Sequence, residues 1–231
     1  MVLFIPGFMQ RGDAWRPVAE RLPESYPSAL LDHREHSFEG RLREIAAAGE
    51  GRVLAGYSLG GRLALRAALR EPGRYAGLVT VSTTAGIDEP AARSARAEAD
   101  ERLAAWIEAS PIDDVVSVWE RQPLFADQSD ALLEQQRPGR LSHEPAGLAL
   151  LLRTAGQGML EPVWHELVRL ELPLLAIAGD RDDGYVRAAR RIAETAPRAR
   201  EAIVEEAGHA PQLQQPEEVA RLIAEFLEGV G

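Results

Sequence analysis

The sequence predicts an α/β fold, in which a mostly parallel sheet of about six strands is flanked by helices and carries an inserted helical cap. Two observations lead to this fold class. Short apolar runs alternate with segments of helical periodicity, and these runs are continuous rather than interrupted by polar residues. Continuous apolar strands are buried on both faces, as they are in a parallel sheet covered by helices. The 231 residues, 45% of them apolar, suffice for such a core.

Turn signals and periodicity set the expected order of elements. We expect strands at residues 2–5, 28–31, 52–55, 77–82, 174–178 and 202–204. We expect helices at residues 14–21, 37–48, 60–69, 185–195 and 216–227. The first strand ends at Pro6-Gly7 and the fifth at Gly179-Asp180, both of which favour turns. Strand and helix therefore follow each other regularly except in one long segment.

That segment, residues 88–170, contains no convincing strand and several helical patterns. It includes the tryptophans at 106, 119 and 164, and it is too long for a simple connection between strands. We therefore expect it to be a helical cap inserted between the fourth and fifth strands. Residues 1–87 and 171–231 would form the core domain.

Composition narrows the class of partner. The formal net charge of -10 disfavours non-specific binding to nucleic acid but leaves room for a small anionic substrate. The chain has no cysteine, and all 26 basic residues are arginine. No apolar stretch approaches the ~18 residues of a membrane span, and the apolar start at 2–5 is too short for a signal peptide. We expect a cytoplasmic protein, and no pattern in the sequence indicates an oligomeric state.

The segment Gly56-Tyr57-Ser58-Leu59-Gly60 follows a predicted strand and begins a predicted helix. This is the context of the G-x-S-x-G nucleophile elbow of α/β-hydrolases. Glycine is required at 56 and 60 for a steric reason, because side chains at these positions would collide with the neighbouring strand and helix. Ser58 then lies at a helix N-terminus, where free N–H groups favour developing negative charge. We expect Ser58 to be the nucleophile or base.

A serine hydroxyl needs an imidazole to activate it, and the imidazole needs a carboxylate to orient it. In this fold these groups follow the serine in the order acid, then histidine. His209 comes just after the last predicted strand and fits this order. The acid should follow the fifth strand, where Asp182 is preferred, Asp183 is the alternative and Asp180 is expected to cap the turn. The other histidines precede the serine or lie in the expected cap: His33, His36, His143 and His165.

An oxyanion hole requires two backbone N–H groups. One belongs to the residue after the nucleophile, here Leu59. The other comes from the loop after the first strand, and in Pro6-Gly7-Phe8 we assign it to Phe8.

Several further motifs point to one branch of this superfamily. The elbow continues into Arg62, and the segment at 119–125 reads Trp-Glu-Arg-Gln-Pro-Leu-Phe. Arg93 and Arg96 are followed by Asp100, and Arg140-Leu141 precedes a Pro-x-Gly-Leu sequence at 145–148. In these motifs the chain, from about residue 4 to 227, resembles the 2-succinyl-6-hydroxy-2,4-cyclohexadiene-1-carboxylate synthases of menaquinone biosynthesis.

The resemblance implies a lyase that eliminates pyruvate from 2-succinyl-5-enolpyruvyl-6-hydroxy-3-cyclohexene-1-carboxylate by proton abstraction. It implies a triad of Ser58, Asp182 and His209, without a metal or organic cofactor. It also implies substrate contacts from a set of arginine and aromatic side chains: Tyr57, Arg62, Arg96, Trp119 and Arg140. Guanidinium groups bind carboxylates bidentately, which suits a substrate with three acidic groups.

The chain departs from the family pattern in three loops. Pro6 replaces the family's histidine before Gly-Phe, residues 32–37 lack two glycines, and the acid loop lacks the lysine that relatives often carry. Two other functions therefore stay open. One is a carboxylesterase or related serine hydrolase with the same triad, acting on a small ester. The other is a binding protein that has kept the fold.

Overall fold

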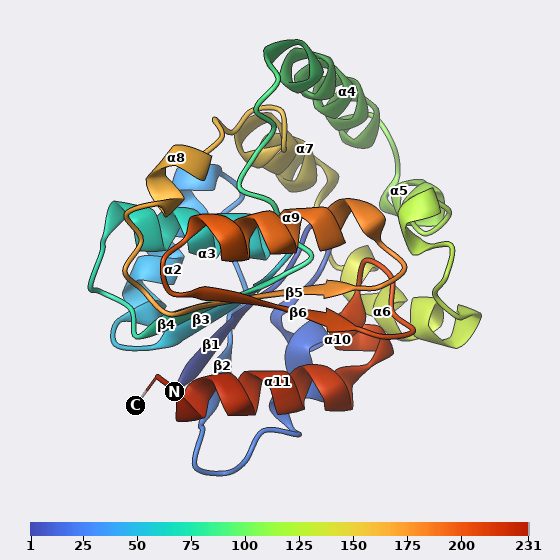
Figure 1. The fold of residues 1–231 in the computed structure, drawn as a ribbon. Helices are drawn as coiled ribbons and strands as arrows, with labels where there is room; N and C mark the ends of the chain where they lie inside the picture. Colours follow the sequence, from blue (N-terminus) through green and yellow to red (C-terminus); the bar gives the residue numbers. More distant parts are fainter. Residues whose placement is uncertain (231) are drawn as a thin grey trace.

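The computed structural model describes residues 1–230 and contains one parallel sheet of six strands in the order β2-β1-β3-β4-β5-β6 (Figure 1). All five neighbouring strand pairs are parallel. The strands are β1 (Val2–Ile5), β2 (Ser28–Leu30), β3 (Val53–Tyr57), β4 (Gly77–Val81), β5 (Leu174–Gly179) and β6 (Ala199–Val204). The predicted fold class is confirmed.

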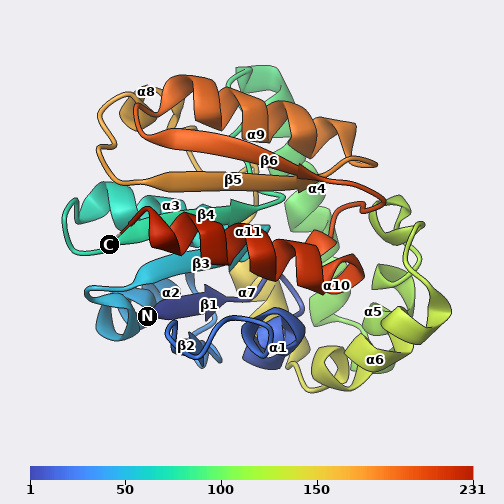
Figure 2. The ribbon, with the colours of Figure 1, turned by 60° about the horizontal axis from the view of Figure 1, so that its bottom comes forward.

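Helices cover both faces of the sheet, and each face has its own apolar cluster. Helices α2 (Phe38–Gly49), α3 (Leu59–Arg70) and α9 (Asp183–Thr195) lie on one face (Figure 1). Helices α1 (Arg16–Ala19) and α11 (Pro216–Glu228) lie on the other, as the turned view in Figure 2 also shows. The central strands β1, β3, β4 and β5 are buried along their whole length, which explains their continuous apolar sequences.

Most predicted elements have bounds within two residues of those in the structure, and two elements differ by more. The strand expected at 202–204 begins at Ala199, because β6 is an edge strand whose exposed Arg200 and Glu201 interrupt the apolar pattern. The helix expected at 14–21 is a 3₁₀ turn, η1 (Gly12–Trp15), followed by the four residues of α1. Pro17 has no N–H to extend an α-helix from the preceding turn, so it lies in the first turn of a new one.

Between β4 and β5 the structure contains helices and no strand. They are α4 (Pro90–Glu108), α5 (Ile112–Trp119), η2 (Pro123–Phe125), α6 (Asp130–Leu141), α7 (Pro145–Ala155) and α8 (Trp164–Leu167). Helices α4, α5 and α7 share an apolar cluster that also takes in Met9. Helix α8 instead packs Trp164 and Leu167 into the cluster on the sheet. Helices α5 and α6 lie beyond the carboxyl ends of the strands (Figure 2).

Among residues 1–230, no helix has both the length and the apolar character that crossing a membrane requires.

The turn between α6 and α7 buries a histidine that we expect to make stability depend on pH. His143 is 6% exposed, and its Nε2 has no hydrogen-bond partner. Burial, aided by the charges of Arg11 and Arg41, lowers its pKa from 6.5 to about 4. Between these two values the unfolded chain takes up a proton that the folded chain does not, so the free energy of unfolding falls as the pH falls. From pH 7 to pH 5 we expect His143 to account for a loss of about 2 kcal/mol.

Urea unfolding of the wild type, His143→Gln and His165→Gln at both pH values measures this loss. His165 is exposed and serves as the matched control. We expect the loss of stability to shrink by about 2 kcal/mol in His143→Gln only. An equal loss in all three proteins would contradict the assignment.

Candidate active site

The turn from β3 into α3 holds Ser58 in an uncommon backbone conformation. Its φ is +50° and its ψ is -109°, a combination that residues other than glycine rarely adopt. The predicted collisions at its flanking glycines are confirmed. A Cβ at Gly56 would lie 2.4 Å from the Gly60 carbonyl oxygen, and one at Gly60 would lie 2.3 Å from the Ile5 oxygen. The turn therefore presents the Ser58 side chain at the carboxyl end of the sheet.

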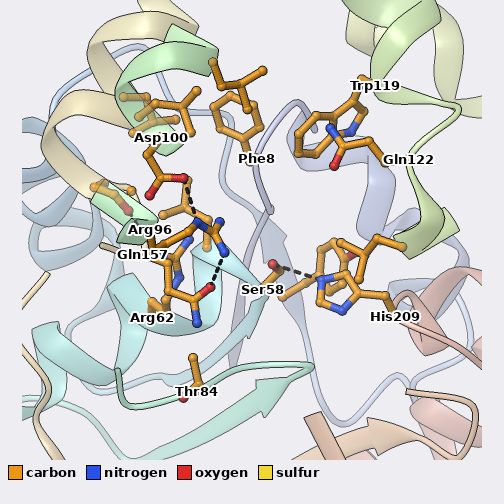
Figure 3. A pocket seen from close by; sticks show the side chains of 18 of the residues that line it. Phe8, Ser58, Arg62, Thr84, Arg96, Asp100, Trp119, Gln122, Gln157 and His209 are labelled. Carbon is orange, nitrogen blue, oxygen red and sulfur yellow. Dashed lines mark hydrogen bonds and ion pairs between the residues drawn. The ribbon is translucent and has the colours of Figure 1, made fainter. Parts of the chain in front are cut away.

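The structure brings Ser58, His209 and Asp182 together from three separate loops. The Oγ of Ser58 lies 3.2 Å from Nε2 of His209 (Figure 3). The Nδ1 of His209 lies 2.8 Å from Oδ2 of Asp182. Asp182 is also the N-cap of α9, where its other oxygen accepts the Tyr185 N–H at 3.3 Å. These contacts have the connectivity of a hydroxyl, its base and an orienting carboxylate.

The two other aspartates of this loop have different positions. Asp180 accepts the Ala207 N–H at 3.1 Å and so ties the end of β5 to the loop that carries His209. Asp183 is exposed in the first turn of α9 and does not contact the imidazole. The geometry thus favours Asp182 over Asp183, and Asp180 holds the turn as expected.

Two aromatic rings pack against the imidazole. The ring centroid of Tyr185 lies 4.5 Å from that of His209, and the ring centroid of Tyr57 lies 5.4 Å away. His209 itself is only 3% exposed. Packing and the Asp182 contact together restrict the imidazole to the orientation that faces Ser58.

The two predicted oxyanion donors, Phe8 and Leu59, line the same cavity as Ser58. Leu59 begins α3, so its N–H has no acceptor within the helix. Around Phe8 the loop closes as a tight turn, with the Gln10 N–H donating to the Gly7 oxygen and Met9 at a φ of +56°. The turn forms with Pro6 in place. Pro6 has no N–H, but it removes no donor from the oxyanion hole because the assigned donor is Phe8.

A cavity of about 580 Å³ lies over Ser58, between the strand ends and the inserted helices. Every residue that the resemblance implies as a substrate contact lines it: Tyr57, Arg62, Arg96, Trp119 and Arg140. The ring centroids of Trp119 and Phe8 lie 5.1 Å apart, and both side chains lie above Ser58 in Figure 3. In the same view Arg62 and Arg96 lie on one side of Ser58, with His209 on the other.

The three arginines differ in their partners. Arg96 forms an ion pair with Asp100 at 2.8 Å and also donates to Gln157. Arg140, 2% exposed, pairs with Glu120 at 3.0 Å, and burial lowers its pKa.

Arg62 differs from both, because its hydrogen bond goes to the Ala155 carbonyl oxygen and no carboxylate in residues 1–230 pairs with it. Burial lowers its pKa as well, but Arg62 stays charged at neutral pH. It is thus the arginine of the cavity best placed to attract an anion.

Several cavity residues were not predicted from the sequence. Asp100 lies four residues after Arg96, a helical spacing that could have indicated their ion pair. The spacing of Glu120 and Gln122 gave no sign that the first would pair with Arg140 or that the second would line the cavity. Tyr185 lies three residues after Asp182, a helical spacing that would have placed both on one side of α9. No group of three or more acidic or histidine side chains within residues 1–230 is arranged to hold a metal ion.

Known proteins match the chain over nearly its whole length. A sequence model described as the alpha/beta hydrolase family matches residues 2–222. A Bacillus subtilis (strain 168) protein named "Putative 2-succinyl-6-hydroxy-2,4-cyclohexadiene-1-carboxylate synthase" is 29% identical, with 99% of this chain and 90% of that one covered.

Two solved structures match the fold closely. MenH from S. aureus has a TM-score of 0.88 at 25% identity, covering 99% of this chain and 93% of that chain. A thermophilic esterase from Thermogutta terrifontis, with malate bound, has a TM-score of 0.81 at 25% identity, covering 99% and 89%. Because the family model spans almost all of the sequence and the sheet has the expected topology, the chain is an enzyme of the alpha/beta hydrolase family.

Proposed function

We propose that this protein is a lyase of menaquinone biosynthesis that eliminates pyruvate from 2-succinyl-5-enolpyruvyl-6-hydroxy-3-cyclohexene-1-carboxylate. The observation that carries the proposal is the placement of three arginines around one cavity that also contains the Ser58 hydroxyl. A substrate with three carboxylates needs several fixed cations near the reacting carbon. The name of the Bacillus subtilis relative supports the same reaction.

In this proposal Ser58, His209 and Asp182 act as a triad. Nε2 of His209 accepts the Ser58 hydroxyl proton, and Asp182 holds the imidazole in the required tautomer and stabilises its charged form. The activated oxygen of Ser58 removes a proton from the substrate ring. The electron pair of that C–H bond forms a new ring double bond, the existing ring double bond shifts toward the carbon that carries the enolpyruvyl oxygen, and the C–O bond there breaks. The enolpyruvate that leaves takes up a proton and becomes pyruvate. The N–H groups of Phe8 and Leu59 stabilise the charge that develops on the succinyl carbonyl.

We also propose that residues 88–170 act as a cap on a core of residues 1–87 and 171–231. The cap supplies Arg96, Trp119 and Arg140 to the cavity, whereas the core supplies Tyr57 and Arg62. This division would let the core hold the chemistry and the cap select the substrate.

A serine esterase is the second candidate, because the same triad cleaves esters in this superfamily and a thermophilic esterase is among the close structural neighbours. One comparison separates the two. Purified protein is given the menaquinone intermediate, with pyruvate measured, and separately p-nitrophenyl acetate, with nitrophenol measured. The lyase proposal expects pyruvate release with a specificity constant at least about a hundredfold above that for the ester. Rapid ester cleavage without pyruvate would establish the esterase instead.

Replacing Arg62 tests the role of its charge. Arg62→Gln leaves no buried carboxylate without its cation, unlike the removal of Arg96 from Asp100. We expect KM for the anionic substrate to rise about tenfold to a hundredfold, since one charge-assisted contact is lost. KM for p-nitrophenyl acetate should change less than about threefold. Arg70→Gln, on the exposed end of the same helix, is the control, and equal effects on both substrates would contradict the role.

A further inference from the structure

Tyr185 contacts two members of the proposed triad at once. Its backbone N–H donates to Oδ1 of Asp182 at 3.3 Å. Its ring packs on His209 with centroids 4.5 Å apart and planes inclined by 56°. A change in this side chain would therefore alter the position of the imidazole directly.

The hydroxyl of Tyr185 is a free donor in the cavity. Tyr185 lines the cavity, and its hydroxyl forms no hydrogen bond with any side chain or backbone group of residues 1–230. Burial raises the pKa of the phenol, so it is protonated at neutral pH. A protonated phenol without an acceptor, on a residue that lines the cavity, is suited to donate to a ligand oxygen.

The charges around Tyr185 indicate what that ligand oxygen belongs to. Arg62 and Arg96 line the same cavity as Tyr185, and their positive charges oppose the effect of burial on the pKa of its phenol. Arg96 already faces Asp100, whereas Arg62 has no carboxylate partner in the described chain. Because Arg62 and Tyr185 line one cavity, a carboxylate bound to Arg62 would lie near Tyr185.

We propose that Tyr185 is a specificity-determining residue: its hydroxyl donates to the substrate carboxylate held by Arg62, and its ring positions His209. The inference rests on the proposed function, since it assigns a binding partner to one acidic group of that substrate. The hydroxyl and the guanidinium together form a two-point site for a carboxylate, which a neutral ester would not use.

Two substitutions separate the hydroxyl from the ring. In Tyr185→Phe the ring remains, so we expect KM for the anionic substrate to rise about tenfold with kcat changed less than about threefold. In Tyr185→Leu the ring is lost, so we expect kcat to fall and fluorophosphonate labelling of Ser58 to slow, each by about tenfold or more. Tyr75→Phe is the matched control, because Tyr75 is buried outside the cavity and its hydroxyl also lacks a partner.

A measurement without turnover keeps this inference distinct from the lyase proposal. Succinate is used as the carboxylate probe, and its protection of Ser58 from a fluorophosphonate is measured in the wild type, Tyr185→Phe and Tyr75→Phe. We expect the half-protecting concentration to rise about tenfold in Tyr185→Phe only. Such a rise supports the carboxylate site even if the wild type releases no pyruvate, an outcome that would reject the lyase alone. Equal protection in all three proteins, or no protection of the wild type, overturns the role of the hydroxyl.

Discussion

Ser58→Ala should abolish pyruvate release while leaving the fold intact. The Ser58 hydroxyl is the group that lies 3.2 Å from Nε2 of His209. Without it, the imidazole has no partner there with which to exchange a proton. Removing the nucleophile or base of a triad lowers kcat by about a thousandfold to a millionfold in comparable enzymes. The substitution removes one oxygen and one long hydrogen bond, and alanine has to adopt the same positive φ that serine already adopts. We therefore expect the thermal midpoint to shift by less than about 2 °C.

Steady-state pyruvate release and a thermal melt of the same preparations measure both effects. Ser82→Ala is a suitable control, because Ser82 also has a positive φ and is fully buried but does not line the cavity. It should retain activity within about threefold. Activity in Ser58→Ala near that of the wild type would remove Ser58 from the mechanism.

Asp182→Asn should have the second largest effect, a fall in kcat of about a thousandfold to ten-thousandfold. Asparagine retains the shape and remains a good N-cap for α9, so the fold should persist. The amide can present an N–H rather than an oxygen to Nδ1 of His209, 2.8 Å away, which favours the tautomer whose Nε2 carries the proton. That imidazole cannot accept the proton of Ser58.

Asp183→Asn is the matched control, since this neighbouring aspartate is exposed and it is Asp182 that bonds to the imidazole. It should leave kcat unchanged within about twofold. If Asp183→Asn were instead the damaging substitution, the orienting acid would have to be reassigned. Circular dichroism of both variants checks that any loss of activity is not a loss of structure.

The residues of the proposed triad could be identified as candidates from the sequence because their positions depend on local rules. The elbow around Ser58 needs glycines at fixed offsets, and the fold fixes the order in which acid and histidine follow the strands. The geometry of Asp182 and His209 agrees with that order. The same reasoning preferred Asp182 and kept Asp183 as the alternative, and the structure shows that it is Asp182 that contacts His209.

The charge pairing within the cavity could not be predicted, because it depends on how helices far apart in the sequence pack. Glu120, at the end of α5, meets Arg140 on α6 across 20 residues of chain. Arg96 and Asp100 lie one helical turn apart, but the sequence alone gave no reason to expect that Arg62 would lack a similar partner. The length of edge strand β6 was underestimated for a different reason, because exposed charged residues interrupt its apolar pattern.

The role of Ser58 in pyruvate release is tested most directly by measuring the labelling of this serine and the activity in the same sample. The enzyme is titrated with a fluorophosphonate, the fraction of chains labelled at Ser58 is counted by peptide mass spectrometry, and the remaining pyruvate release is measured at each point. We expect activity to fall in proportion to labelling at Ser58 and to reach zero when every chain carries one label. Full labelling of Ser58 with undiminished pyruvate release would contradict this expectation.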